Sequence, residues 1–395
     1  MIYFDNAATT KMAKEAAAHM QGVNEKIFGN PSSLHSFGLE AERIVTDARK
    51  TIAETIGANP QQIHFTSGGT EANNLAILGY LQANPRAGKH IIATKIEHAS
   101  VHEVYAYLET QGYEVDYIPV SYDGLVDIAA LEEMVREDTA LVSIVYVNSE
   151  IGVIQNMDEI VSVVKSSAGN NLLSTFVKGN QKGVMLHTDF VQGFCKIPID
   201  LQRTKLDLLS ASGHKLHGPK GTGFLYVRDG IKIAPLLYGG GQENGLRSGT
   251  ENVPAIAGLG AAVQKQHAAM HDNYGKVRKL NEQFRNALKE APFEYMILSP
   301  GRGTPYILSV AFRNVKAEVI VHHLSDAHIY VSAGSACAGK RNKVSRVVQA
   351  LQVSETYAEG VLRFSFSADN TAEEVEKVVD ALFEIIPTVA HQVAK

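Results

Sequence analysis

One lysine of this sequence, Lys215, lies where a lysine is well placed to act as a nucleophile. It follows Ser212-Gly213-His214 and precedes a glycine-containing stretch that ends at Gly221. A lysine attacks an aldehyde only in its neutral form, so it needs partial burial or neighbours that lower its pKa. The pattern favours a lysine that forms a Schiff base, although an ordinary buried lysine between a strand and a loop would look the same.

A carboxylate and an amide follow an apolar run upstream of this lysine. Residues 183–186 are typical of a short buried strand, and Asp189 and Gln192 come directly after it. Open α/β sheets bind ligands at the carboxyl ends of their strands. A carboxylate at that edge can keep a pyridine nitrogen protonated, as pyridoxal phosphate chemistry requires, and Gln192 would donate a hydrogen bond to the ring hydroxyl.

Further upstream, a strand-like run at 63–67 leads into Gly68-Gly69-Thr70 and then into an apolar helix through residue 78. The free N–H groups and the positive dipole end of such a helix favour an anion, and glycine lets a phosphate approach the backbone. The simpler interpretation of this turn alone is a helix capped by a serine or threonine.

A histidine, His98, follows the predicted strand at 90–94. Its ring could stack on a pyridine ring and pass protons. The sequence holds 15 histidines, so one histidine alone would be assigned a structural role. However, the phosphate turn, histidine, carboxylate and lysine occur in the order and rough spacing of a fold-type I pyridoxal phosphate enzyme.

From Tyr3 to Ser365 the chain resembles the NifS/IscS-type cysteine desulfurases of the class V aminotransferase superfamily. The matching segments are 3–10, 28–33, 67–71, 97–98, 189 with 192, 212–215, 239–243 and 247–250. The segment Ser332-Ala333-Gly334-Ser335-Ala336-Cys337 resembles the family's nucleophile loop, whose cysteine is absent from the transaminase relatives.

The resemblance implies an α/β, fold-type I transferase with a mainly parallel seven-stranded sheet in a large domain and a smaller α+β C-terminal domain. The implied domains are 12–255 for the large one, and 1–11 with 256–395 for the small one, which carries the nucleophile loop at about 332–346. The alternation of strand-like runs at 90–94, 114–120, 140–147 and 206–210 with helical runs agrees with a parallel sheet. Helical patterns cover 253–271, 275–288 and 372–386.

The implied reaction converts L-cysteine to L-alanine and leaves a persulfide on Cys337. Lys215 would carry pyridoxal 5'-phosphate and remove the α-proton, His98 would assist proton transfer, and Arg363 would bind the substrate carboxylate. A homodimer is implied, with Thr250 reaching the phosphate held by the partner subunit. The cofactor-binding residues expected from the resemblance are Gly69, Thr70, His98, Asp189, Gln192, Ser212, His214, Lys215 and Thr250.

The sequence contains only two cysteines, without the paired spacing of a zinc site or a redox pair. Cys195 has apolar neighbours and is predicted to be a small buried hydrophobe. Cys337 precedes a basic stretch at 338–346 whose charges favour the thiolate. Arg363 falls inside a strand-like alternation, where an unpaired charge is costly, so a carboxylate partner is expected for it.

Composition limits the function classes. A chain of 395 residues with 45% apolar residues and a net charge of −5 is typical of a soluble globular protein large enough for two domains. No strong charge balance for nucleic-acid binding is present. The first residues lack the pattern of a secretory signal and no long uncharged apolar stretch occurs, so we expect a cytoplasmic protein that does not enter the membrane.

Two departures from the family pattern leave questions open. Ser149 stands where relatives commonly have asparagine, and 166–183 is longer than usual, most simply as a surface insertion. The basic stretch after Cys337 favours an acidic sulfur acceptor, either an iron–sulfur scaffold or a tRNA-thiolation enzyme. A selenocysteine lyase, another class V enzyme and an inactive cofactor-binding adaptor remain as alternative functions.

Overall fold

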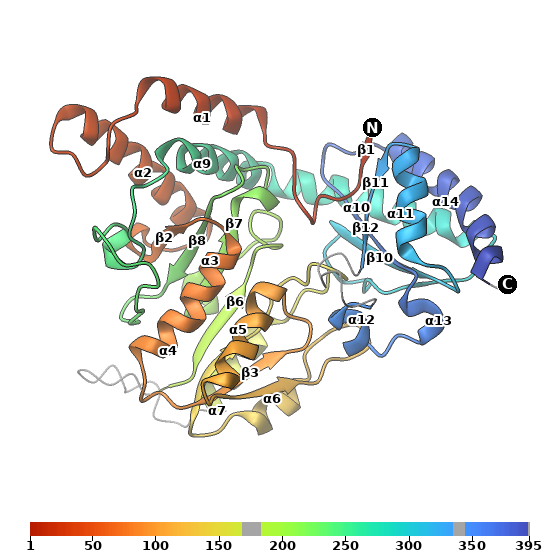
Figure 1. Cartoon of the computed structure of the whole chain (residues 1–395), viewed down its shortest axis with the longest axis horizontal. Coiled ribbons are helices and arrows are strands. Elements are labelled where there is room, and N and C mark those ends of the chain that lie inside the picture. Colours follow the sequence, from red (N-terminus) through yellow and green to blue (C-terminus); the bar gives the residue numbers. More distant parts are fainter. Residues whose placement is uncertain (168–182, 335–343, 394–395) are drawn as a thin grey trace.

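The computed structural model describes residues 1–167, 183–334 and 344–393 (Figure 1). In the described residues, the larger part of the molecule is built on a seven-stranded sheet of order β2-β8-β7-β6-β5-β3-β4. Neighbouring strands are parallel, except that β8 runs antiparallel to both β2 and β7. The mainly parallel seven-stranded sheet expected from the sequence is therefore confirmed. In chain order, the strands are β2 (Ile63–Thr66), β3 (His90–Thr94), β4 (Glu114–Ile118), β5 (Thr139–Ser143), β6 (Met185–Asp189), β7 (Leu208–Ser212) and β8 (Gly223–Val227).

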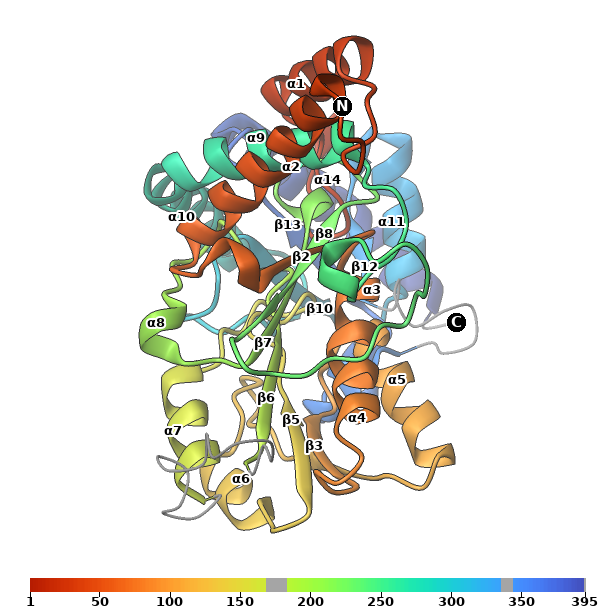
Figure 2. The same cartoon turned by 90° about the vertical axis from the view of Figure 1, so that its left-hand side faces the viewer.

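Helices cover both faces of this sheet, which explains why β3, β5, β6, β7 and β8 are buried along their whole length. Figure 2 shows the sheet nearly edge on, with helices on each side. One face packs against α3 (Gly69–Asn74), α4 (Tyr80–Ala83) and α5 (Ala99–Thr110). The other packs against α2 (Ser36–Thr55), α6 (Ile128–Met134), α7 (Met157–Ser167), α8 (Leu201–Thr204) and α9 (Val253–Ala268), and α1 (Lys14–Lys26) packs on α9.

The helix that begins at Gly69 is continuous. A π-helical stretch, Leu75–Gly79, joins α3 to α4, so one helix runs from 69 to 83. Its apolar side, which includes Ala72, Leu75 and Ala76, is buried against the sheet. The apolar helix predicted after the glycine turn is therefore present, and its N-terminus is held at the end of β2.

The C-terminal part contains, within the described residues, a four-stranded antiparallel sheet of order β12-β13-β10-β9. Its strands are β9 (Tyr295–Ile297), β10 (Ile307–Phe312), β12 (Ser332–Ala333) and β13 (Val361–Ser365). A second hydrophobic core forms where helices pack on this sheet, with Phe284, Leu308 and Phe364 fully buried. The helices of this part are α10 (Met270–Ala287), α11 (Ala317–Asp326), α12 (Arg346–Ala350), α13 (Glu355–Ala358) and α14 (Ala372–Val393).

The N-terminal segment crosses from the larger part to the C-terminal part (Figure 1). Its strand β1 (Ile2–Tyr3) pairs in parallel with β11 (Ile329–Tyr330). A separate apolar cluster, which includes Ile96, Ile151 and Val347, packs the two parts together beside it. The site described below lies where these contacts bring the two parts together.

Several element boundaries differ from those predicted. The strand expected at 206–210 is β7, two residues later, because its pairing with β8 begins at Leu208 while Asp207 accepts hydrogen bonds from Lys165 and Arg228. The helix expected at 253–271 is α9, which ends at Ala268, and α10 follows from Met270. Most of the expected insertion at 166–183 lies outside the described residues, and the domain limits stay a prediction.

In the part of the chain that the structure describes, no helix combines the length and the hydrophobicity needed to cross a membrane.

Candidate active site

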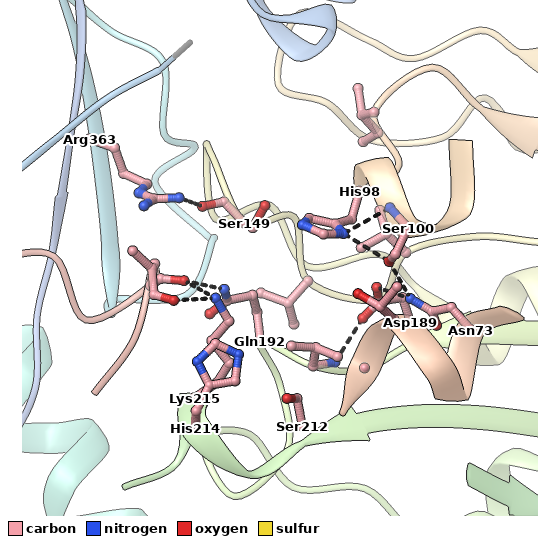
Figure 3. A pocket seen from close by; sticks show the side chains of 18 residues that line it. Asn73, His98, Ser100, Ser149, Asp189, Gln192, Ser212, His214, Lys215 and Arg363 are labelled. Atoms are coloured by element: carbon pink, nitrogen blue, oxygen red, sulfur yellow. Dashed lines mark hydrogen bonds between the residues drawn. The ribbon is translucent and has the colours of Figure 1, made fainter. Parts of the chain in front are cut away.

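A cavity of about 290 Å³ lies at the carboxyl ends of β6 and β7, close to the C-terminal part (Figure 3). This is the edge where ligands bind in open α/β sheets. The predicted site residues that line the cavity are Gly69, Thr70, His98, Asp189, Gln192, Ser212, His214, Lys215 and Arg363. These nine predicted residues, which lie up to 294 positions apart in the chain, therefore meet at one site.

Lys215 ends a single 3-10 turn, Gly213–Lys215, that follows β7. Its Nζ donates hydrogen bonds to the carbonyl oxygens of Ala7 and Ala8, each at 2.7 Å. Both carbonyls can only accept, so the Lys215 amine donates one hydrogen bond to each. The N-terminal segment thus supplies a docking position for the Lys215 amine, a feature that the sequence motifs did not indicate.

Gln192 is buried and oriented by two neighbours. Its Nε2 donates to the carbonyl of Ala7 at 2.9 Å, and its Oε1 accepts from Nζ of Lys196 at 3.3 Å. Burial lowers the pKa of Lys196 to about 7. Because the carbonyl of Ala7 can only accept, it orients the amide nitrogen of Gln192 toward itself, which leaves the amide oxygen toward Lys196.

Asp189, at the end of β6, has both carboxylate oxygens in hydrogen bonds. Oδ1 accepts from the backbone N–H of Val191 at 2.9 Å, and Oδ2 accepts from Nδ2 of Asn73 at 2.9 Å. Only 5% of the residue is exposed, on the side of the cavity. The carboxylate is thereby fixed in position, as a partner for a pyridine nitrogen has to be.

His98 is the N-cap residue of α5 and lines the same cavity. Its Nδ1 accepts a hydrogen bond from the backbone N–H of Ser100 at 3.1 Å and lies 2.8 Å from Oγ of Ser100. Burial is the main cause of the lowered pKa of His98. Asn73 and Ser100, which the sequence analysis missed, therefore connect two predicted site residues, Asp189 and His98.

The glycine turn at the start of α3 opens onto a second hollow of about 360 Å³. Gly69, Thr70, Ser212 and His214 line both this hollow and the main cavity, so the two spaces meet at the helix N-terminus. A Cβ on Gly69 would lie 2.8 Å from a methyl group of Val191, so a larger residue would crowd this position. The free N–H groups, the helix dipole and the hydroxyl of Ser212 suit a phosphate group.

Arg363, in β13, projects toward this cavity with its guanidinium held on several sides. Nη1 donates to the carbonyl of Ser149 at 2.9 Å, and Nη2 donates to Oδ1 of Asp5 at 3.0 Å and to Oγ of Ser332 at 3.1 Å. Asp5 provides a carboxylate partner for Arg363 within the chain, and binding of the substrate carboxylate by Arg363 stays a prediction. Ser149 acts through its main chain here, so its short side chain does not affect this contact.

Among the described residues, Thr250 is the predicted site residue that does not line this cavity. Thr250 is exposed and lines another hollow with Glu243 and Arg247, so within one chain it does not meet the other cofactor-binding residues. Cys337 lies outside the described residues. Cys195 is 7% exposed and burial raises the pKa of its thiol, which confirms it as a small buried residue. In the described ranges, no group of three or more His, Cys, Asp or Glu side chains could hold a metal ion.

Comparison with known proteins agrees with this site. The aminotransferase class-V family model matches residues 2–378. The cysteine desulfurase IscS of Methanosarcina thermophila is 40% identical over 98% of this chain and 92% of that protein. A solved NifS-like protein superimposes with a TM-score of 0.89 at 35% identity, covering 98% of this chain and 99% of that one.

A further solved structure, SspA in complex with cysteine, covers 94% of this chain and 100% of that one, with a TM-score of 0.80 and 34% identity. Matches of this extent include both the larger and the C-terminal parts of the molecule. The chain therefore belongs to the class V aminotransferase family and, within it, to the cysteine desulfurases of the IscS and NifS type.

Proposed function

We propose that the cavity holds pyridoxal 5'-phosphate, and that the protein converts L-cysteine to L-alanine there and transfers the sulfur to Cys337. The observation that carries this proposal is the convergence of Lys215, Asp189 and His98 on one cavity that ends at a helix N-terminus. When bound, the cofactor supplies an electron sink for the negative charge that develops at the substrate α-carbon.

The residues present fit this group. Asp189 would bind the pyridine nitrogen, Gln192 the ring hydroxyl, and Lys215 the aldehyde carbon. The phosphate would lie at the N-terminus of α3, against Gly69, Thr70, Ser212 and His214. Glu71 on the first turn of α3 does not oppose this anion strongly, since Arg247 pairs with its carboxylate at 3.0 Å. Each contact uses a donor or a charge of the type required.

Lys215 moves the substrate proton in this proposal. The amine of Lys215 would accept the α-proton of the substrate, and the carbonyls of Ala7 and Ala8 would then stabilise the resulting ammonium group. The same group can return a proton to the organic fragment that leaves as alanine. Arg363 binds the substrate carboxylate. Asp5 competes with this carboxylate for the guanidinium group of Arg363.

The sulfur step needs a thiolate, which Cys337 provides. Its sulfur attacks the substrate sulfur, a sulfur–sulfur bond forms, and the substrate carbon–sulfur bond breaks with its electron pair left on carbon. Overall, the Cys337 thiol and cysteine give the Cys337 persulfide and alanine, so atoms and electrons balance without an added oxidant.

The partners are also proposals. We infer a homodimer in which Thr250 completes the phosphate site of the partner subunit. The exposure of Thr250 and its distance from the cavity of its own chain support this arrangement. The basic stretch at 338–346 favours an acidic acceptor protein, serving iron–sulfur assembly or tRNA thiolation. A cytoplasmic location stays a prediction.

The deciding experiment incubates the cofactor-loaded protein with stoichiometric cysteine, measures alanine, and locates added sulfur by intact mass. We expect one extra sulfur on the wild type and on Cys195→Ser, but none on Cys337→Ser or Lys215→Ala. The two cysteine variants are a matched pair, because the chain has no other cysteine. Alanine without persulfide would contradict the role of Cys337, and turnover of selenocysteine alone would favour a selenocysteine lyase.

A further inference from the structure

We propose that Asn73 and Ser100 hold His98 as the neutral tautomer with its proton on Nε2, so that His98 donates a hydrogen bond into the cavity and does not carry protons. The tautomer follows from the hydrogen bonds alone, and its role in catalysis rests on the proposed function. This tautomer replaces the expected role of His98 in proton transfer and leaves proton transfer to Lys215, as in the proposed function.

The network starts at Asp189, whose two oxygens both accept N–H hydrogen bonds. Asn73, which is fully buried, must therefore direct its amide nitrogen, not its amide oxygen, toward this carboxylate. The second hydrogen of the same nitrogen points to Oγ of Ser100 at 2.9 Å. Asp189 thus sets the orientation of the Asn73 amide. In this orientation Asn73 donates to Oγ of Ser100, which acts as an acceptor.

The hydrogen bonds of Ser100 in turn determine which ring nitrogen of His98 carries the proton. Because Oγ of Ser100 already accepts from Asn73, its own hydrogen is free to be donated to Nδ1 of His98, 2.8 Å away. The backbone N–H of Ser100 also points at Nδ1, at 3.1 Å, and a backbone amide can only donate. Two donors directed at Nδ1 leave it without a proton, so the proton of the neutral ring is on Nε2.

The surroundings of His98 also oppose its conversion to the cation. A proton on Nδ1 would face the N–H of Ser100, and the ring lies at the positive end of the 12-residue helix α5. Burial lowers its pKa most, Asp189 raises it, and Lys215 and Arg363 lower it. Nε2, which among the described residues makes no hydrogen bond to the protein, is turned toward the cavity on the side of Ser149 (Figure 3).

A neutral imidazole with Nε2–H toward the reacting atoms can stabilise negative charge by donating a hydrogen bond. It cannot act as a base there, because Nε2 has no free electron pair, and loss of its proton would produce a strongly basic anion. A helix N-terminus is known to keep a histidine neutral for such an electrophilic role. Ser100 and Asn73 are therefore positioning residues, and Lys215 is the proton carrier.

The test is long-range ¹H–¹⁵N correlation spectroscopy of the full-length protein labelled with [¹⁵N]histidine, with and without the cofactor. A His98→Gln spectrum identifies the His98 signals among those of the 15 histidines. At about pH 6.5, where an unperturbed histidine is half protonated, we expect a bare Nδ1 and a protonated Nε2. A protonated Nδ1, or two protonated nitrogens, in the cofactor-loaded wild type would overturn the proposal.

Two variants test the network itself. Asn73→Asp replaces a donor with an acceptor of nearly the same shape, so the Ser100 hydroxyl should turn toward residue 73 and its oxygen should then accept a proton from Nδ1. We expect the pKa of His98 to rise in this variant, and most of the rise to vanish when Ser100→Ala is added. If the pKa of His98 rose equally in the single and the double variant, the charge at residue 73 alone would be acting. This result would refute the proposed hydrogen-bond network through Ser100.

Ser100→Ala alone keeps the backbone donor and is the variant least disturbing to the fold. We expect Nδ1 to stay bare while its ¹⁵N signal moves, because it loses one of its two donors. An unmoved signal would show that the hydroxyl does not reach Nδ1, and would contradict the proposal even if Asn73→Asp failed to fold.

Discussion

Glu97 is a buried carboxyl group whose replacement by glutamine should reduce the dependence of stability on pH. Oε1 accepts from the hydroxyl of Thr94 at 2.6 Å and from the N–H of Val145 at 2.9 Å. Oε2 is buried and has no partner among the described residues. Burial, the largest cause, raises the pKa of Glu97 from 4.5 to about 8.

The direction of the pH dependence follows from the number of protons bound to the folded and the unfolded protein. Between pH 4.5 and about 8 the folded protein keeps a proton on Glu97 that the unfolded chain releases, so stability falls as the pH rises through this range. At about 1.4 kcal/mol per pH unit the full loss is about 5 kcal/mol, of which roughly 3 kcal/mol falls between about pH 5 and pH 8. A glutamine does not titrate, so Glu97→Gln should lack this loss.

The assay is urea unfolding followed by far-UV circular dichroism, since the chain contains no tryptophan. We expect the difference in unfolding free energy between Glu97→Gln and wild type to rise by roughly 3 kcal/mol in favour of the variant between about pH 5 and pH 8. Glu103→Gln is a control, because the hydrogen bond from Arg346 lowers the pKa of the exposed Glu103 below 4.5, so its difference from wild type should stay constant between about pH 5 and pH 8.

A constant difference between Glu97→Gln and wild type over this range would refute the reasoning. It would mean that Glu97 ionises at the same pH in the folded and unfolded states, and that the buried Oε2 reaches water or a donor.

The remaining predictions concern three ion pairs. Arg49→Met should lower the free energy of unfolding by about 3–5 kcal/mol, because it leaves the carboxylate of Glu243, with 2% of its side chain exposed, without its bidentate partner. Arg278→Met, which breaks an exposed helical pair, should change it by less than about 0.5 kcal/mol in the same urea assay. Asp5→Asn should lower the KM for cysteine about tenfold, equal to about 1.4 kcal/mol, because Arg363 loses a competing carboxylate; a rise in KM, measured from alanine release, would show instead that Asp5 positions Arg363.

The residues that could be predicted from the sequence are those that follow a recognisable strand. Asp189 and Ser212 end strands, Lys215 follows three residues after one, and His98 comes four residues after the end of β3. The parallel sheet brings these strand ends to one edge, so local patterns were sufficient to place their side chains together. The resemblance to a family with the same motifs added the cofactor and the reaction.

The supporting contacts could not be predicted in this way. Asn73 meets Asp189 across 116 positions, and Lys215 meets the carbonyl of Ala7 across 208. A main-chain carbonyl has no signature in a sequence, and an asparagine on an apolar helix is usually a capping or surface residue. One signal for Asn73 was available: it lies three positions after Thr70, on the same face of the helix whose N-terminus was predicted to bind phosphate.

The strand order was also beyond the sequence alone. The alternation of strands and helices indicated a parallel sheet, but the position of β2 at one edge, beyond the antiparallel β8, depends on packing between distant segments. For the same reason Asp5 was not recognised as the partner of Arg363, 358 positions away.

The path of the first ten residues has a consequence for how the protein matures. The carbonyls of Ala7 and Ala8 hold Lys215, yet the N–H of Ala7 bonds to Ser365 and β1 pairs with β11. During synthesis these residues are made more than 300 positions before the strands that receive them, β11 and β13. Contacts of such long sequence separation form late and slowly. The strands of the larger sheet are all made before β13, so this sheet can assemble first, whereas the contacts around Lys215 are completed only after β13 has been made.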